Sequence, residues 1–155
     1  MGGIKDTITT FLIVDDDPRE RMLVELAFEH IADPRIRLKQ LSDGDEAIAY
    51  LKREGCYQDS AKYPAPHVIL LDIKMPRVNG FEFLKWLRHQ APAPCNLIPV
   101  VVMSSSTEKK DIDLAYSLGA NTYFVKPIDW NEFRTRLRAL GIYWTEHAEL
   151  PNRRM

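Results

Sequence analysis

Short apolar segments alternate with longer amphipathic segments along most of the chain. Residues 11–14, 68–71 and 98–103 are apolar runs of four or more positions, bounded by polar or turn residues. Such runs are typical of strands buried on both faces of a sheet. Residues 36–41 alternate between apolar and polar positions, which predicts a strand near a sheet edge. Residues 122–125 form a fifth short strand signal.

The segments between these strands predict five helices, because their apolar residues recur at helical spacing. An Asp or Asn followed three residues later by Glu, a typical helix start, occurs at Asp17/Glu20, Asp43/Glu46, Asn79/Glu82 and Asp129/Glu132. A fourth helix is predicted over residues 107–118, without this pattern. Turn residues predict where helices end: Asp33-Pro34, residues 91–94, Gly119 and Gly141. Residues 54–66 are predicted to form a surface loop.

Five alternations of strand and helix predict an α/β fold with a parallel sheet and helices on both faces. We expect one domain over residues 1–141 and a C-terminal extension over residues 142–155. The composition is ordinary, with 45% hydrophobic and 28% charged residues. A net charge of -1 argues against nucleic-acid or membrane partners. The chain has two isolated cysteines and no apolar run long enough to span a bilayer. We therefore expect a cytoplasmic protein.

Polar residues follow four of the predicted strands. Asp15 and Asp16 follow the first, Asp72 the third, Ser104 the fourth and Lys126 the fifth. Because the carboxyl ends of parallel strands share one edge of a sheet, these side chains can converge. Neighbouring carboxylates repel unless a cation joins them, and carboxylate oxygens suit Mg²⁺. A carboxylate, a hydroxyl, an ammonium and a metal are the groups needed to move a phosphoryl group.

Four sequence stretches, in order, carry a family resemblance. They are residues 12–18, 70–80, 99–104 and 124–127. Through them the sequence resembles the receiver domain of a two-component response regulator over about residues 8–140. It is similar in particular to the stand-alone receivers that partner bacterial phytochromes. The resemblance implies a flavodoxin-like, doubly wound (βα)5 sandwich with strand order 2-1-3-4-5.

The resemblance also implies a role for each acidic residue. Asp72 would accept a phosphoryl group from a phosphohistidine of a sensor histidine kinase. Asp16 would bind Mg²⁺ directly and Asp15 through water, while the backbone carbonyl of Lys74 would be a further ligand beside Asp72. The side chain of Lys74 is left open, either near the site or over the surface. Asp17 is better explained as a helix cap than as a ligand.

Four further residues receive roles from the same resemblance. Ser104 would hydrogen-bond a phosphoryl oxygen and Lys126 would pair with another. Pro127 would follow a cis peptide bond. Tyr123 would change rotamer when Ser104 moves, although an ordinary half-buried strand aromatic is the alternative. Ser104 with its two neighbouring serines is alternatively a polar turn that caps the next helix.

The extension contains Tyr143, Trp144 and Leu150, which are unusual for a free tail. They either fold back on their own domain or bury against a partner. The resemblance implies an arm that joins two protomers, so we expect a homodimer. With too few residues after Asp129 for an output domain, the signal would pass through the fourth helix, fifth strand and fifth helix, or through the dimer.

The expected function is that of a phosphoacceptor switch, not of an enzyme beyond its own phosphotransfer and dephosphorylation. Its expected partners are a sensor histidine kinase, with a bacteriophytochrome as the candidate, and a downstream phosphotransfer or effector protein. The alternative is a phosphorylation-independent interaction module with a receiver fold. A phosphatase of the haloacid dehalogenase type would need a second aspartate two residues after Asp72, where Lys74 stands.

Overall fold

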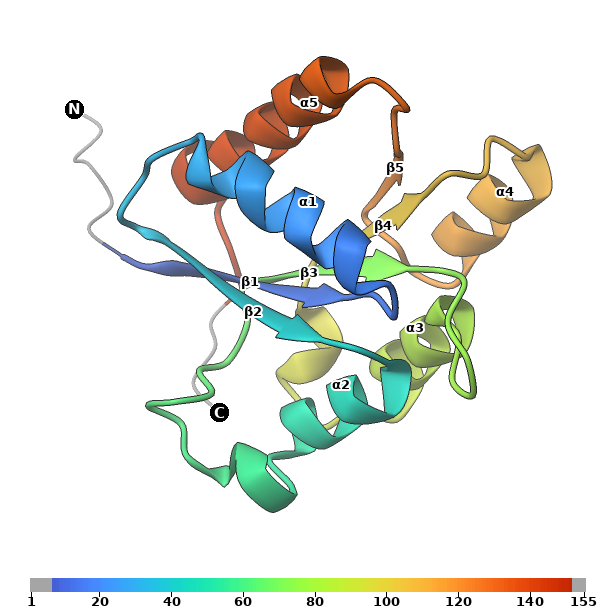
Figure 1. Cartoon of the computed structure of the whole chain (residues 1–155). Coiled ribbons are helices and arrows are strands. Elements are labelled where there is room, and N and C mark those ends of the chain that lie inside the picture. The colour runs from blue at the N-terminus through green and yellow to red at the C-terminus, as the bar shows by residue number, and fades with distance from the viewer. Residues whose placement is uncertain (1–6, 152–155) are drawn as a thin grey trace.

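A sheet of five parallel strands forms the centre of the molecule (Figure 1). The computed structural model describes residues 7–151, so residues 152–155 of the predicted extension lie outside it. The strands are β1 (Thr9–Val14), β2 (Ile36–Leu41), β3 (Val68–Asp72), β4 (Val100–Ser104) and β5 (Thr122–Val125). Their order is β2-β1-β3-β4-β5, which confirms the flavodoxin-like topology and places the alternating strand at an edge.

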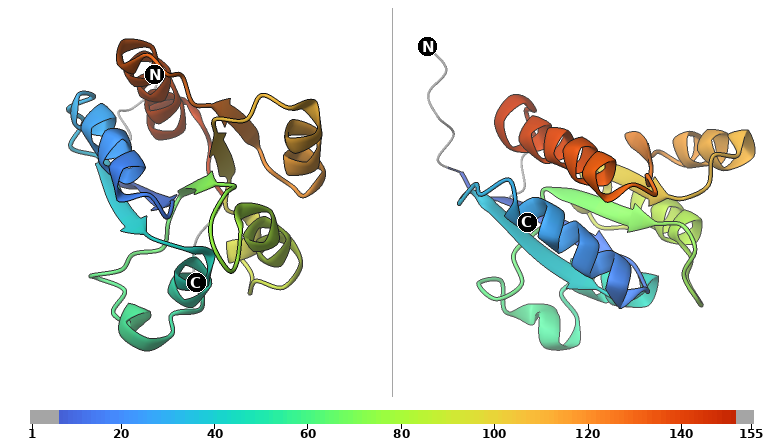
Figure 2. Two further views of the ribbon diagram at one scale, coloured as in Figure 1. Left: turned by 45° about the vertical axis from the view of Figure 1, so that its right-hand side comes forward. Right: turned by 45° about the horizontal axis from the view of Figure 1, so that its top comes forward.

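Helices cover both faces of the sheet (Figures 1 and 2). They are α1 (Pro18–Glu29), α2 (Gly44–Lys52), α3 (Gly80–His89), α4 (Lys109–Ser117) and α5 (Trp130–Ile142). Helices α1 and α5 pack on one face, and α2, α3 and α4 pack on the other. Single short helical turns lie at Gly55–Gln58, Cys95–Leu97 and Tyr143–His147. Within residues 7–151, no helix is both long and apolar enough to cross a membrane.

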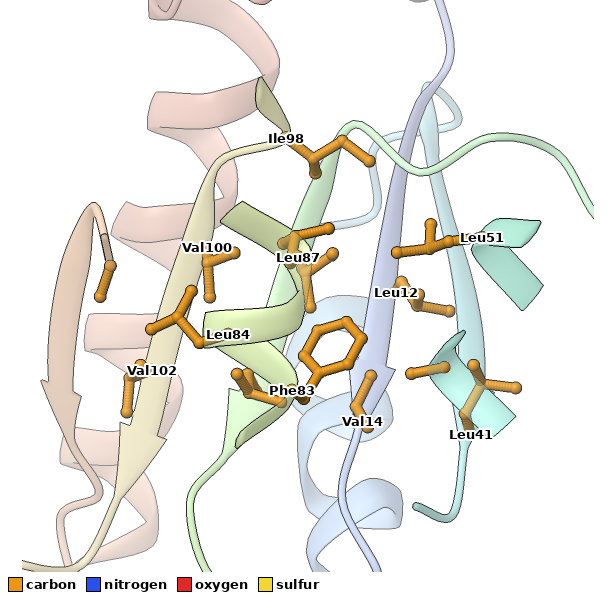
Figure 3. Close-up of a cluster of buried hydrophobic side chains, with 14 of the residues drawn as sticks. Leu12, Val14, Leu41, Leu51, Phe83, Leu84, Leu87, Ile98, Val100 and Val102 are labelled. Atoms are coloured by element: carbon orange, nitrogen blue, oxygen red, sulfur yellow. The ribbon is translucent and has the colours of Figure 1, made fainter. Parts of the chain in front are cut away.

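The central strands divide their side chains between two cores, because neighbouring residues of a strand point to opposite faces. In β1, Phe11 and Ile13 face α1 and α5, while Leu12 and Val14 face α2 and α3. Figure 3 shows the core between the sheet and helices α2 and α3, in which Phe83 of α3 lies against β1. Burial on both faces explains why these strands are apolar at consecutive positions.

The predicted caps are confirmed at three helices. At the starts of α2, α3 and α5 an Asp or Asn side chain accepts a hydrogen bond from the backbone N–H of the Glu three residues later (Asp43, Asn79 and Asp129). At α1 the pattern differs, since Asp17 accepts from the backbone N–H of Arg19 at 2.8 Å. The backbone N–H of Asp17 donates to Asp15 Oδ1 and not to the Glu20 carboxylate, so no capping box forms and Glu20 is available for another contact.

Gly141 does not end a helix, contrary to the prediction. Helix α5 continues to Ile142 and then into a π-helical turn over Tyr143–His147. A Cβ on Gly141 would lie 2.8 Å from the Cδ1 atom of Ile31. The glycine therefore allows α5 to approach the end of α1 closely. Glycine occurs both at helix ends and where two backbones approach closely, so a glycine alone does not mark the end of a helix.

The C-terminal extension folds back on its own domain. Trp144 and Leu150 pack against the core between α1, α5 and the sheet. The Arg35 guanidinium bonds the Glu146 carboxylate at 2.8 Å and ties the π-helical turn to the loop before β2. Tyr143 remains 52% exposed. The sequence left open whether this segment packs on its own domain or against a partner. In the single chain, Trp144 and Leu150 pack on their own domain.

Candidate functional site

The carboxyl ends of four strands place the predicted site residues along one edge of the sheet. Asp72 is the last residue of β3 and Ser104 the last of β4. Asp15 and Asp16 follow β1 directly, and Lys126 follows β5. Because these neighbouring strands are parallel, the residues after their last apolar positions meet at the same edge.

Three carboxylates form the centre of the site. One oxygen from each of Asp15, Asp16 and Asp72 lies within 4.8 Å of the other two. Asp15 is buried and Asp16 is exposed, so the cluster opens to solvent on the Asp16 side. The backbone N–H of Asp17 donates to Asp15 Oδ1 at 2.9 Å and orients that carboxylate.

Lys126 supplies a buried positive charge beside these acids. Its ammonium nitrogen lies 3.1 Å from Asp15 Oδ2, 3.2 Å from Glu20 Oε2 and 3.9 Å from Asp72 Oδ1. Burial acts to lower the pKa of Lys126, but the three carboxylates outweigh it and hold that pKa above its usual value. Lys126 therefore carries its charge throughout the physiological pH range.

Asp72 is the acid whose protonation is most affected by this environment. Burial is the main cause that raises the pKa of Asp72 to about 6. The positive charge of Lys126 acts to lower this pKa, while the negative charges of Asp15 and Asp16 raise it further. Its ionised form is thus short of stabilising positive charge. Hard oxygen ligands in a cluster with excess negative charge fit a divalent cation such as Mg²⁺.

The end of β4 is linked to β5 by hydrogen bonds. Ser104 is buried, and its hydroxyl accepts from the backbone N–H of Ser106 at 3.1 Å. The Lys126 backbone N–H donates to the Ser104 carbonyl at 2.7 Å. The Tyr123 hydroxyl donates to the Ser106 carbonyl at 3.0 Å. Ser106, whose hydroxyl accepts from Glu108 N–H, is the serine that supports the start of α4.

Lys74 and Pro127 lie beside the site, in the segments that follow β3 and β5. The side chain of Lys74 is exposed. The cis peptide bond predicted at Pro127 is wrong, since among the described residues the cis bond joins Ala93 to Pro94. For X–Pro bonds the two isomers differ by only about 0.5–1 kcal/mol, so tertiary surroundings decide between them.

Sequence reasoning missed the part that Glu20 plays at this site. The Asp17/Glu20 spacing predicted only a helix cap. It did not predict the ion pair between Glu20 and Lys126. No local signal joins these two residues, because one lies on α1 and the other follows β5.

Sequence reasoning also missed Arg77, which follows Asp72 in the loop before α3. Arg77 has a left-handed backbone with φ of 61°, and its guanidinium pairs with Asp43 and lies 3.4 Å from Asp45. These contacts hold the loop that carries Lys74 against the start of α2.

A hollow lies beside Lys126, between the first turns of α1 and α5. Apolar side chains contribute most of its lining, including Leu23, Ile128 and Trp130, and Ser105 also lines it. Ile128 is fully exposed. The site is therefore bordered by an apolar surface next to the Lys126 ammonium.

The chain is similar in sequence to known proteins. The family model of the response regulator receiver domain matches residues 11–138. The chain is 31% identical to the probable methanogenesis regulatory protein FilR2 of Methanothrix harundinacea over 86% of this chain and 81% of that protein. It is 29% identical to the response regulator Rcp1 of Synechocystis over 90% of each.

Two crystal structures extend the comparison. The Mn²⁺-bound form of Rcp1 superposes with a TM-score of 0.81 at 28% identity, covering 93% of this chain and 99% of that one. The phosphorylated cyanobacterial phytochrome response regulator RcpA gives a TM-score of 0.83 at 28% identity, covering 94% and 100%. From the family match and the shared fold, this chain belongs to the response regulator receiver domain family.

Proposed function

We propose that Asp72 accepts a phosphoryl group from a phosphohistidine of a sensor histidine kinase. The observation that carries this proposal is the position of the Asp72 carboxylate, grouped with two further acids and 3.9 Å from the Lys126 ammonium. Membership of the receiver family supports the same chemistry. The chain then acts as a phosphoacceptor and performs only its own phosphotransfer and dephosphorylation.

The transfer exchanges one bond for another. An Asp72 oxygen forms a bond to phosphorus as the P–N bond to the kinase histidine breaks, and the electron pair of that bond returns to the imidazole, which takes up a proton. The Lys126 ammonium offsets charge on the phosphoryl oxygens. Asp15, Asp16, Asp72 and the Lys74 carbonyl would hold Mg²⁺, which would supply further positive charge to offset the negative charge of the phosphoryl group.

The change at Asp72 is passed to the surface through the end of β4. We propose that Ser104 bonds a phosphoryl oxygen, so that its hydroxyl changes partner and the loop before α4 shifts. Tyr123 is coupled to this loop by its hydrogen bond to the Ser106 carbonyl. The exposed side chains of Leu114 and Tyr116 on α4 lie on the surface that then changes.

The partner kinase is proposed to be a bacteriophytochrome, with a downstream phosphotransfer or effector protein as the second partner. Similarity to RcpA, described as a phytochrome response regulator, supports this choice. Because receiver domains typically meet their kinases in the cytoplasm, we propose the same compartment for this chain. We further propose a homodimer joined through the C-terminal extension, with the exposed Tyr143 as its main contact.

Labelling with acetyl phosphate tests the phosphoacceptor. With Mg²⁺ present, wild-type protein should become phosphorylated, and Asp72→Asn should reduce labelling to background because the amide is not a nucleophile for phosphorus. Excess chelator should also abolish labelling of the wild type. Phosphate-affinity electrophoresis gives the readout.

Asp113→Asn is the matched control, since Asp113 is an exposed acid on α4 that pairs with Lys109. It should label like the wild type. Equal labelling of wild type and Asp72→Asn contradicts the proposal. A wild type that stays unlabelled and does not respond to beryllofluoride would instead be a phosphorylation-independent interaction module.

A further inference from the structure

Glu20 reaches the phosphorylation site from the first turn of α1. Its spacing from Asp17 predicted a cap, yet the Asp17 carboxylate is occupied by the backbone N–H and the side chain of Arg19. The Glu20 carboxylate turns instead toward Lys126, with Oε2 at 3.2 Å from the ammonium nitrogen. This ion pair joins α1 to the segment that follows β5.

The ammonium of Lys126 has three carboxylates within reach and holds two of them closely. Asp15 and Glu20 lie at 3.1 and 3.2 Å, whereas the nearest oxygen of Asp72 lies at 3.9 Å. The negative charge of Glu20 offsets part of the Lys126 charge and holds the ammonium on the α1 side of Asp72. A group attached to Asp72 has to compete with Glu20 for that charge. The Lys126 ammonium thus lies closer to the Glu20 carboxylate of α1 than to the Asp72 carboxylate proposed to carry the phosphoryl group.

The two close contacts differ in how easily they are given up. The Asp15 side chain is 7% exposed, whereas that of Glu20 is 36% exposed and can be rehydrated when its partner leaves. Buried charges keep their partners because an unpaired buried charge is costly, while partly exposed pairs are weak. Glu20 is therefore the contact that Lys126 releases when a stronger anion appears on Asp72.

We propose that Glu20 is a positioning residue that competes with the phosphoryl group on Asp72 for the Lys126 ammonium. In this way it lowers the occupancy of the phosphorylated state. This inference rests on the proposed role of Asp72 and adds a regulator of the same site. Glu20 touches neither the phosphorus nor the attacking oxygen, and acts only through Lys126.

Beryllofluoride binding in the presence of Mg²⁺ measures the competition by calorimetry. Glu20→Gln should bind beryllofluoride about threefold to fivefold more tightly than wild type, the range expected for loss of a partly exposed ion pair. Glu25→Gln is the matched control, because Glu25 is an exposed acid on the same helix that bonds Gln40 and not Lys126. Its affinity should stay at the wild-type value.

A second readout uses the metal-free protein and needs no ligand. The side-chain ¹⁵N signal of Lys126 reports whether its ammonium is held or mobile. In Glu20→Gln the ammonium should exchange its protons faster and its nitrogen should become more mobile, while Glu25→Gln should leave the signal unchanged. A Glu20 that served only to support α1 would not alter Lys126 in this way.

The outcomes separate the two proposals. Equal affinity of wild type and Glu20→Gln, an equal gain in Glu25→Gln, or an unchanged Lys126 signal would each overturn the role of Glu20 and leave Asp72 as the acceptor. A wild type whose beryllofluoride binding is absent, or survives in Asp72→Asn, would overturn the proposed function itself. Tighter binding together with a mobile Lys126 in Glu20→Gln alone supports the competition.

Discussion

At the scale of single residues, the chemistry of the site follows from one buried carboxylate with too little positive charge around it. The Asp72 side chain is 14% exposed and shares the Lys126 ammonium with Asp15 and Glu20. Burial is the main cause that raises the pKa of Asp72 to about 6. A carboxylate held in this state gains from any cation that approaches it, and it stays basic enough to attack phosphorus near neutral pH.

The raised pKa of Asp72 predicts how stability depends on pH in metal-free protein. The folded state binds the Asp72 proton more tightly than the unfolded chain, whose pKa is near 3.8. The contribution of this group is therefore fully present below pH 4 and is lost as the pH rises to 6. At pH 7 in chelator, Asp72→Asn should be more stable than wild type, by up to about 3 kcal/mol.

Urea unfolding at pH 7 and pH 4 checks this prediction, with chelator present throughout. The advantage of Asp72→Asn should shrink at pH 4, where wild-type Asp72 is protonated in the folded state. An advantage of the same size at both pH values, or none at pH 7, would show that Asp72 is not destabilised by its surroundings.

At the scale of secondary-structure elements, α3 begins directly against the end of β3. The Gly80 backbone N–H donates to the Ile73 carbonyl at 2.9 Å. A Cβ at this position would lie 2.2 Å from the Asp72 carbonyl oxygen and 2.8 Å from the Cα atom of Ile73. Both atoms belong to the backbone, so they cannot move aside like a flexible side chain. The glycine therefore lets α3 pack against the end of β3, beside Asp72.

Gly80→Ala should destabilise the protein by about 3 kcal/mol, because the added methyl forces the backbone beside Asp72 to shift. Chemical denaturation measures the change. Gly55→Ala is the matched control: its φ is +57° but no atom lies within 4 Å of a Cβ there. That variant should lose only about 1 kcal/mol. Similar losses in the two variants would argue against the close approach at Gly80.

At the scale of the whole molecule, the C-terminal extension completes the α1–α5 face of the domain. Trp144 and Leu150 contribute to the core on that face, and Glu146 is bonded to Arg35. Trp144 therefore has a structural role in the single chain. Replacing it by a smaller residue would reduce the stability of the fold as well as any dimerisation, so the two effects could not be separated. Tyr143, at the start of the same turn, is exposed and is the better probe of association.

Tyr143→Ser should shift the sedimentation mass of the protein from dimer toward monomer, because it removes the exposed aromatic proposed to meet the second copy. Leu97→Ser is the control, since Leu97 is also an exposed apolar residue but lies in the turn before β4. A monomeric wild type, or a Tyr143→Ser protein that remains dimeric, would contradict a dimer joined through this segment.

Much of this molecule was predictable from local sequence, and the two wrong predictions share a cause. The strands, the caps at Asp43, Asn79 and Asp129, and the gathering of acids at one sheet edge were predicted. The end of α5 at Gly141 and the cis bond before Pro127 were wrong. At both positions the residue type permits two structures that are close in free energy, and packing elsewhere in the chain selects one.

The sequence alone determined which segments form strands and helices, because apolar period and capping act over a few residues. It also determined that carboxylates, a hydroxyl and an ammonium stand at strand ends. Only the tertiary structure decided which of these groups touch. The bond between Lys126 and Asp15 joins residues 111 positions apart, and Glu20 enters the site through the packing of α1 against α5. Side-chain partners at such separations depend on how the elements pack, which local patterns do not encode.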